Sequence, residues 1–160
     1  MKAVSIIAKK MILYSHWNLQ NINYFMRIYA YAKLFGETEK LGKDTQKTLD
    51  IAAVIYDIAC PLCLHKYGNP DSKRQEMERI ILVEEFLRGA EILEEMKKRI
   101  VYLVDHYHIY TNVDGKDNQI LFEADYLVNE DKSSYSKKNI QYFMDKIFRT
   151  KTEKRITKIY

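Results

Sequence analysis

The chain has 160 residues, of which 47% are hydrophobic and 30% are charged, and only five are glycine and two proline. This length and composition are those of one globular domain that can bury a core without disulfides or a structural metal. We therefore expect a single domain over residues 1–160. The 26 basic and 22 acidic residues are interleaved and leave a formal charge of +4, so charge alone does not predict a nucleic-acid partner.

The sequence pattern is not that of a secreted or membrane protein. Charged residues interrupt every apolar segment before it reaches the roughly 18 to 20 consecutive apolar residues that a bilayer-spanning helix needs. The apolar stretch 3–8 is followed by Lys9 and Lys10 without a cleavage site of small residues, unlike a signal peptide. Because Cys60 and Cys63 form no framework of spaced cysteines, we expect a cytoplasmic protein without membrane contact.

The first predicted helix runs from Asn18 to Gly36, which are a suitable N-cap and a suitable terminator. A second helix begins at Asp44, which can cap it, and ends near Pro61, which cannot continue a helix. Residues 49–58 are densely apolar, so we expect this second helix to be central and buried. In the first helix, the apolar residues that recur with helical spacing are Ile22, Phe25, Met26, Tyr29 and Ala32.

The rest of the chain predicts further helices separated by short loops. The predicted elements are a turn at 67–72, a charged helix with Ile80, Ile81, Val83 and Phe86 on one side, a break at Gly89, a helix from Ile92 toward His106 and His108, a loop at 111–115, and helices at about 117–128 and 136–148. No segment alternates for long with the period of two that is typical of a strand. We predict an all-α fold, a single-domain helical bundle.

Four polar residues interrupt the apolar faces of these helices: Tyr24, Tyr56, Asp57 and Asp125. Burial of a carboxylate is costly unless a cation or hydrogen bonds compensate for it. Asp57 and Asp125 must therefore face a metal ion, a basic group, hydrogen-bond donors or water. These residues mark the candidate site.

Five segments resemble, in order, those of a known family. They are NINYFMRIYAYA at 21–32, AAVIYDI at 52–58, QEME at 75–78, LVDHYH at 103–108 and ILFEADYL at 120–127. Together they resemble the HD superfamily of metal-dependent phosphohydrolases, in particular its small bacterial members, with its first helix, its His-Asp helix and its closing aspartate helix. The resemblance is strongest over residues 18–148, leaves 149–160 as a basic tail, and implies the HD-domain fold.

The resemblance also implies which residues would surround a metal. In the family, a first histidine, the His-Asp pair and the final aspartate typically hold a divalent ion that activates water against a phosphate ester. By position, Asp57 and Asp125 match this set, His106 matches a further ligand, Glu76 lies where another histidine is common, and Tyr24 and Tyr56 replace two histidines. A phenol is mostly neutral at pH 7 and is a much weaker metal ligand than imidazole.

The two tyrosines therefore predict a phosphohydrolase-like protein with a degenerate metal site. In the interpretation that we favour, the hydroxyls of Tyr24 and Tyr56 donate hydrogen bonds to Asp57 and Asp125 and fill the space of the metal. Such a protein needs no cofactor, is catalytically inactive, and binds a phosphate-bearing small molecule or a protein partner. A purely structural or interaction role is a third interpretation.

The alternative is an active metal-dependent phosphohydrolase that acts on a nucleotide or another phosphate ester. In that case Mg or Mn is held by a rearranged ligand set of Asp57, Glu76, His106 and Asp125, and Asp57 and His106 are the catalytic residues. The hypothesis requires these four side chains to converge within coordinating distance.

Two cysteines and three histidines could suggest further chemical sites, but we interpret most of them as structural or surface residues. Cys60 and Cys63, followed by His65, could be a redox dithiol or half of a zinc site. There is no second pair of cysteines and no alternation of strand and helix patterns, so we interpret them as small apolar residues near a helix end. His108 lies two positions after His106 and points elsewhere on a helix, so we expect His65 and His108 to be surface residues.

The C-terminal segment is rich in lysine and arginine between Lys137 and Lys158 and also contains aromatic residues. A basic segment of this kind could contact nucleic acid or an acidic partner. However, Tyr142 and Phe143 lie at helical spacing from Lys146 and Ile147, which is typical of a helix packed on the core with a solvated basic face. We expect no nucleic-acid partner.

Overall fold

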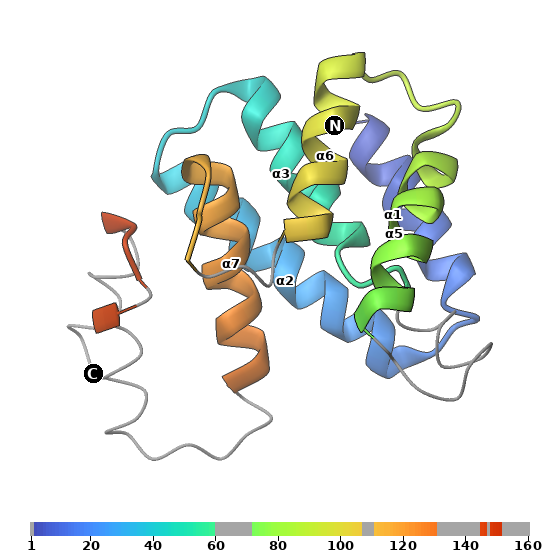
Figure 1. Cartoon of the computed structure of the whole chain (residues 1–160), viewed down its shortest axis with the longest axis horizontal. Helices are drawn as coiled ribbons and strands as arrows, with labels where there is room; N and C mark the ends of the chain where they lie inside the picture. The colour runs from blue at the N-terminus through green and yellow to red at the C-terminus, as the bar shows by residue number, and fades with distance from the viewer. Residues whose placement is uncertain (1, 60–71, 107–110, 131–144, 147, 152–160) are drawn as a thin grey trace.

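The computed structural model of the chain describes residues 2–59, 72–106, 111–130, 145–146 and 148–151. Six helices lie within these residues (Figure 1). They are α1 (Lys2–Tyr14), α2 (Leu19–Thr38), α3 (Lys43–Ile55), α5 (Ser72–Leu87), α6 (Glu94–His106) and α7 (Gly115–Glu130). No strand is found in this part of the chain, so the predicted all-α fold class is confirmed.

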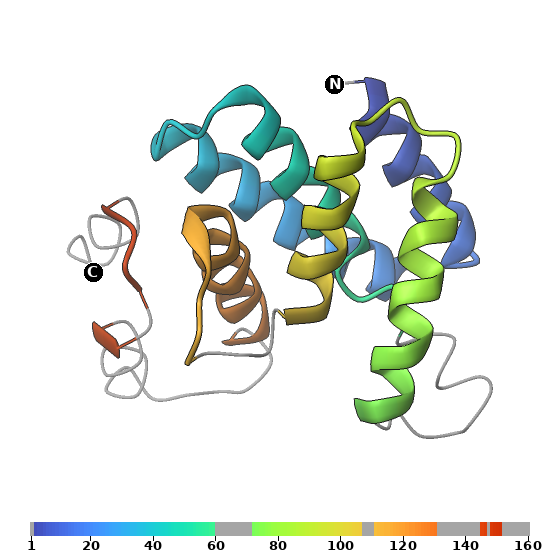
Figure 2. The ribbon, with the colours of Figure 1, turned by 45° about the horizontal axis from the view of Figure 1, so that its top comes forward.

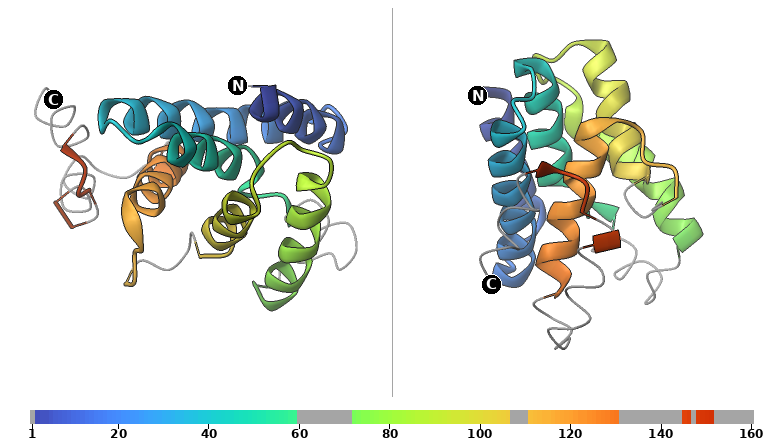
Figure 3. Two further views of the ribbon diagram at one scale, coloured as in Figure 1. Left: turned by 90° about the horizontal axis from the view of Figure 1, so that it is seen from above. Right: turned by 90° about the vertical axis from the view of Figure 1, so that its left-hand side faces the viewer.

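The helices are arranged in two layers. One layer contains α1, α2 and α3, and the other contains α5, α6 and α7 (Figure 3). Across the layers α7 packs on α2, α6 on α3 and α5 on α1, and α6 lies between α5 and α7 (Figure 2). Because α3 also contacts α1, α2 and α7, it lies at the centre of the molecule. Every residue from 48 to 55 is buried, which confirms the predicted central helix.

The start of α2 is as predicted, but its end is not. The Asn18 side chain accepts hydrogen bonds from the backbone N–H groups of Gln20 and Asn21 and caps the helix. Gly36 does not terminate α2, because the helix continues to Thr38. Gly36 is instead a site of close packing, since the Gln46 side chain of α3 occupies the space that a Cβ atom would need.

The start of α3 also differs from the prediction. The N-cap residue is Gly42, which makes no side-chain capping bond, and Asp44 lies inside the first turn. A carboxylate there still interacts favourably with the positive end of the helix dipole. Asp44 was therefore a correct signal for a helix start, but it is not the cap.

The N-terminal helix α1 was not predicted. Its buried residues Ala3, Val4, Ile7 and Met11 recur with helical spacing and face α3 and α5. Two residues with positive φ, His16 at 48° and Trp17 at 60°, then reverse the chain into α2. No helix in the described segments is both long and apolar enough to cross a membrane.

Other predicted elements can be compared only in part. The break at Gly89 is confirmed by its φ of 78°, and α6 and α7 lie where helices were predicted. Met26 and Ile80 are each 37% exposed and Ile81 is 55% exposed, so these apolar residues do not belong to the core. The predicted features outside the described residues are the turn before Ser72, most of the helix predicted at 136–148, Cys60, Cys63, His65, His108 and most of the basic tail.

Residues 148–150 are anchored to α7 by a buried carboxylate. Glu123 is fully buried, and its Oε1 accepts hydrogen bonds from the backbone N–H groups of Arg149 (2.8 Å) and Thr150 (3.1 Å). Its Oε2 accepts a hydrogen bond from the Thr150 hydroxyl at 2.6 Å. Phe148 packs edge-on against Tyr126, with ring centroids 5.6 Å apart. Hydrogen bonds therefore compensate for the burial of the charge and fix this short segment.

We expect Thr150→Val to destabilise the protein. The substitution keeps the shape of the side chain but removes the hydrogen bond to Glu123 Oε2, the only one that this oxygen receives from the described residues. Leaving a buried charged group unsatisfied costs about 1–3 kcal/mol in the free energy of unfolding, which urea unfolding at pH 7 measures. The control is Thr45→Val, at an exposed threonine of α3. Equal stabilities of the two variants would contradict the anchoring role.

Candidate functional site

The candidate site lies between the two layers, where α2, the end of α3 and α7 meet. Tyr24 is on the same side of α2 as the buried residues Ile28 and Phe35, so the helix directs it inward. Tyr56 is the C-cap residue of α3 and is only 3% exposed. Asp125 lies on α7 one turn after the buried Leu121 and is 8% exposed. Three separate elements thus bring Tyr24, Tyr56 and Asp125 together.

Hydrogen bonds join these residues into one network. The Tyr56 hydroxyl donates to Asp125 Oδ1 at 2.5 Å, and Asn129 Nδ2 donates to the same oxygen at 2.6 Å. The Tyr24 hydroxyl lies 2.9 Å from the Tyr56 hydroxyl and 3.1 Å from Asn129 Oδ1. We call Tyr24, Tyr56, Asp125 and Asn129 the tyrosine–aspartate network.

The protons of the network can be assigned from these distances. Tyr56 donates its single hydroxyl proton to Asp125, so its oxygen acts as the acceptor of a hydrogen bond from Tyr24. Tyr24 also has one proton, which it can donate to Tyr56, to Asn129 Oδ1 or to Asp125 Oδ1 at 3.3 Å. Both phenols are therefore neutral donors, and the carboxylate is the acceptor on which the network converges.

The surroundings of Tyr24 favour its neutral form. Burial raises the pKa of Tyr24 above its ordinary value of 10.0, and the negative charge of Asp125 raises it further. Hydrogen bonds with Tyr56 and Asn129 lower the pKa but do not cancel this increase, and the charge of Asp57 adds to it. Tyr24 therefore cannot act as a phenolate at neutral pH.

The two carboxylates of the predicted site, Asp57 and Asp125, lie in different surroundings. The expected hydrogen bond from a tyrosine hydroxyl is present at Asp125. Asp57 follows Tyr56 in the turn after α3, is half-buried, and lies near enough to Tyr24 for its charge to raise the pKa of that phenol. Asn129 was not predicted as a site residue. The available signal was its spacing of one helical turn after Asp125, which places two side chains on the same face of α7.

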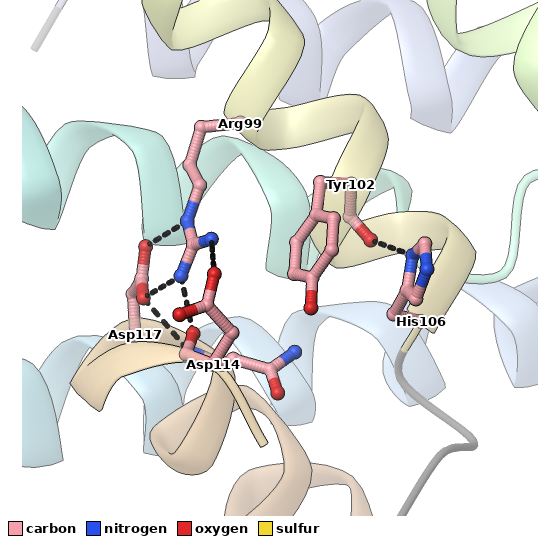
Figure 4. Close-up of polar contacts among 6 residues, drawn as sticks. Arg99, Tyr102, His106, Asp114 and Asp117 are labelled. Atoms are coloured by element: carbon pink, nitrogen blue, oxygen red, sulfur yellow. Dashed lines mark hydrogen bonds and ion pairs between the residues drawn. The ribbon is translucent and has the colours of Figure 1, made fainter. Parts of the chain in front are cut away.

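His106 lies in the last turn of α6, where its ring contacts its own helix (Figure 4). Its Nδ1 is 3.0 Å from the carbonyl oxygen of Tyr102, and the two rings are stacked with centroids 4.1 Å apart. Glu76 belongs to α5, but its side chain is outside the described part of the structure. Among the described residues, no three His, Cys, Asp or Glu side chains are grouped so that they could hold a metal ion.

A second polar cluster fixes the start of α7 (Figure 4). Arg99 of α6 donates from Nε and Nη2 to the two carboxylate oxygens of Asp117, at 2.9 and 2.7 Å, and from Nη1 to Asp114 at 2.8 Å. Hydrogen bonds to Asp117 are the main reason that the pKa of Arg99 is raised, so the guanidinium stays charged. We call these bonds from Arg99 to Asp114 and Asp117 the Arg99 clamp. It was not predicted, because the spacing of residues within one segment of the sequence does not reveal a contact between two helices.

Comparison with known proteins adds no relative. No protein-family model matches the chain, and neither the curated proteins nor the solved structures contain a match. The resemblance to the HD superfamily therefore remains a prediction that rests on the five sequence segments. The structure establishes the all-α architecture and the geometry of the tyrosine–aspartate network.

Tyr56→Phe should destabilise the protein by about 1–3 kcal/mol, because Asp125 stays buried and loses the hydroxyl donor. The free energy of unfolding in urea at pH 7 measures this loss. Tyr31→Phe is the matched control, since Tyr31 stacks on Phe35 and its hydroxyl makes no hydrogen bond within the described segments. If both variants lose the same stability, the bond to Asp125 does not stabilise the fold.

Tyr24 should make the fold sensitive to high pH. In the unfolded chain a tyrosine loses its proton near pH 10, whereas Tyr24 in the folded protein keeps it to higher pH. The contribution to stability is thus fully present below pH 10 and is lost as the pH rises above it. Urea unfolding at pH 9, 10 and 11 should show a shallower loss in Tyr24→Phe, by at most about 1.4 kcal/mol per pH unit and less where solvent screens the site. Parallel pH profiles for both proteins would refute this assignment.

Proposed function

We propose that this protein is a phosphohydrolase-like protein of the HD type whose metal position has been replaced by the tyrosine–aspartate network. In this proposal it is catalytically inactive and binds a phosphate-bearing small molecule or a protein partner. The observation that carries the proposal is the hydrogen bond from Tyr56 to Asp125, with Tyr24 in the same network. Both tyrosines occupy positions where the family resemblance leads us to expect metal-binding histidines.

Competition for Asp125 supports the proposal. A hard divalent ion such as Mg or Mn needs the lone pairs of carboxylate oxygens. The oxygen Oδ1 of Asp125 already accepts two short hydrogen bonds, from Tyr56 and Asn129. An ion that binds this oxygen must displace or reorient these donors, and the lost bonds in a buried site offset part of the binding energy.

The protonation state of the phenols supports the same conclusion. Imidazole offers a metal ion a lone pair at neutral pH, whereas a phenol must first lose its proton to become a strong ligand. The raised pKa of Tyr24 makes this deprotonation less favourable than in water. A substitution of histidine by tyrosine at this position therefore removes a ligand and supplies a hydrogen-bond donor to the remaining carboxylate.

The nature of the ligand is proposed from the resemblance, because members of the family act on phosphate esters. A protein fold that has lost its catalytic metal can still bind phosphate esters, because substrate binding and catalysis depend on different groups of a site. A protein partner is the other form of this proposal.

The alternative function is an active phosphohydrolase with a rearranged ligand set of Asp57, Glu76, His106 and Asp125. One observation favours it: only Nδ1 of His106 is used in the bonds described above, so Nε2 can still act as a ligand. This hypothesis requires a tightly bound ion and hydrolysis of a phosphate ester, both of which must depend on Asp57.

The test is the metal content and metal response of the protein. We expect the purified, chelator-treated chain to contain no stoichiometric metal, and we expect added Mn or Mg to leave its melting temperature unchanged. The double variant Tyr24→His/Tyr56→His should instead be less stable without metal, because Asp125 loses a donor, and should be stabilised by Mn. Differential scanning fluorimetry with and without each ion measures both effects.

Controls separate the proposal from the alternative. Tyr29→His/Tyr31→His changes two tyrosines of α2 outside the network and should not acquire a response to Mn. In the wild type, nucleotides or inorganic phosphate should raise the melting temperature without metal and without being hydrolysed. About one equivalent of copurified metal, together with nucleotide hydrolysis that is lost in Asp57→Ala, would establish the active enzyme and refute the inactive one.

A further inference from the structure

A groove opens on the first layer of helices, away from the tyrosine–aspartate network. Its volume is about 790 Å³, and all its lining residues belong to α1, α2 or the segment 41–50. On α2 the lining residues Met26, Tyr29 and Lys33 form one stripe with helical spacing. Tyr24 lies two residues before Met26 and therefore on nearly the opposite side of α2. The groove and the network are separate sites on different faces of the same helix.

The groove has an apolar floor. Val4, Ala8 and Ile12 follow one another at intervals of one turn along α1, and Met26 and Leu41 face them. Val4 is buried, and Ala8, Ile12 and Leu41 are half-buried, so most of this apolar surface is recessed rather than protruding. A recessed apolar surface of this volume is typical of a small-molecule site, whereas a flat bilayer could not reach its floor.

The charges around the groove leave a small positive excess. The charged lining residues are Lys9, Lys33, Lys43, Lys47, Glu37, Asp44 and Asp50. Lys33 forms an ion pair with Glu37 at 2.8 Å and lies 3.8 Å from Asp50, so these three groups together carry one net negative charge. Asp50 also accepts a hydrogen bond from Gln46 at 2.7 Å. The lining as a whole therefore has four lysines against three carboxylates, a net charge of +1.

Two of the four lysines that line the groove lie at the start of α3. Lys43 is the first residue of the helix, and Lys47 follows one turn later. The N-cap residue Gly42 supplies no side-chain acceptor for the backbone N–H groups of this first turn. The positive end of the helix dipole and the two ammonium groups thus act in the same place. Asp44 lies in the same first turn and offsets one of these charges, and Lys47 Nζ also donates to the carbonyl oxygen of Glu91 at 3.4 Å. The positive charge that is left over favours an anion at this end of the groove.

We propose that this groove binds a single-chain anionic amphiphile, a molecule of the fatty-acid class. Its hydrocarbon chain would lie along Val4, Ala8 and Ile12, and its carboxylate would lie at the start of α3, near Lys43 and Lys47. The apolar floor accounts for the chain, and the positive start of α3, with Lys43 and Lys47, accounts for the sign of the head group. This inference does not depend on the proposed function of the tyrosine–aspartate network.

The test uses dodecanoate below its micellar concentration and the full-length chain. We expect saturable binding by isothermal titration calorimetry, with amide chemical-shift changes in α1, α2 and the start of α3 but not around Tyr56 and Asp125. Ala8→Phe, which fills the groove, and Lys43→Glu/Lys47→Glu, which reverses the charge at its end, should each weaken binding at least about tenfold.

The control variants are Ala30→Phe, at an exposed residue of α2, and Lys98→Glu/Lys116→Glu, at two exposed lysines; none of these residues lines the groove. Both should bind dodecanoate like the wild type. Dodecyltrimethylammonium has a chain of the same length and the opposite charge, and it should bind at least about tenfold more weakly.

Several results would overturn the proposal. Equal affinity for the cationic amphiphile would show that the lysines do not select the head group. Unchanged affinity in a folded Ala8→Phe variant, or chemical-shift changes confined to other faces, would show that the groove is not the site. Binding to vesicles of anionic phospholipid without binding of free dodecanoate would identify surface adsorption instead. If Ala8→Phe does not fold, the chemical-shift map of the wild type decides.

Discussion

The complete burial of α3 is the constraint on which the rest of the structure depends. A helix whose residues 48–55 are all buried must have neighbours on every side, and here they are α1, α2, α6 and α7. This requirement produces the two layers (Figure 3). It also determines the setting of the site, because the polar Tyr56 directly follows this buried run and can keep its hydroxyl in the interior only with a partner.

Helix α7 carries Asp125, the partner of the Tyr56 hydroxyl, and a second buried carboxylate, Glu123. Glu123 and Asp125 are two residues apart, so they point to different sides of α7, and each finds its own donors. Glu123 holds residues 149–150, whereas Asp125 holds the end of α3, and the Arg99 clamp fixes the start of the helix. Polar bonds of high directionality thus define the rotation of α7, in addition to its apolar contacts with α2.

Local patterns predicted the elements better than their ends or their contacts. The N-cap at Asn18 and the buried run of α3 could be predicted, because capping and hydrophobic spacing are properties of neighbouring residues. Gly36 was misinterpreted, since its role depends on Gln46 of another helix. In the site, Tyr24, Tyr56 and Asp125 could be found as polar residues on apolar faces. The bond from Thr150 to Glu123 could not, because the partners are far apart in the sequence.

Under the proposed function, the network also explains why two tyrosines are needed in place of a metal site. A buried carboxylate that loses its cation must gain donors, or its charge destabilises the fold. Tyr56 supplies the direct donor to Asp125, and Tyr24 contacts the Tyr56 hydroxyl from the side of α2. When Tyr24 donates to Tyr56, the bond from Tyr56 to Asp125 polarises the Tyr56 oxygen and makes it a better acceptor, so the two phenols then act as one unit. Under the proposed function, the apo state is therefore the stable state of the fold, and any ion has to compete with the structure itself for Asp125.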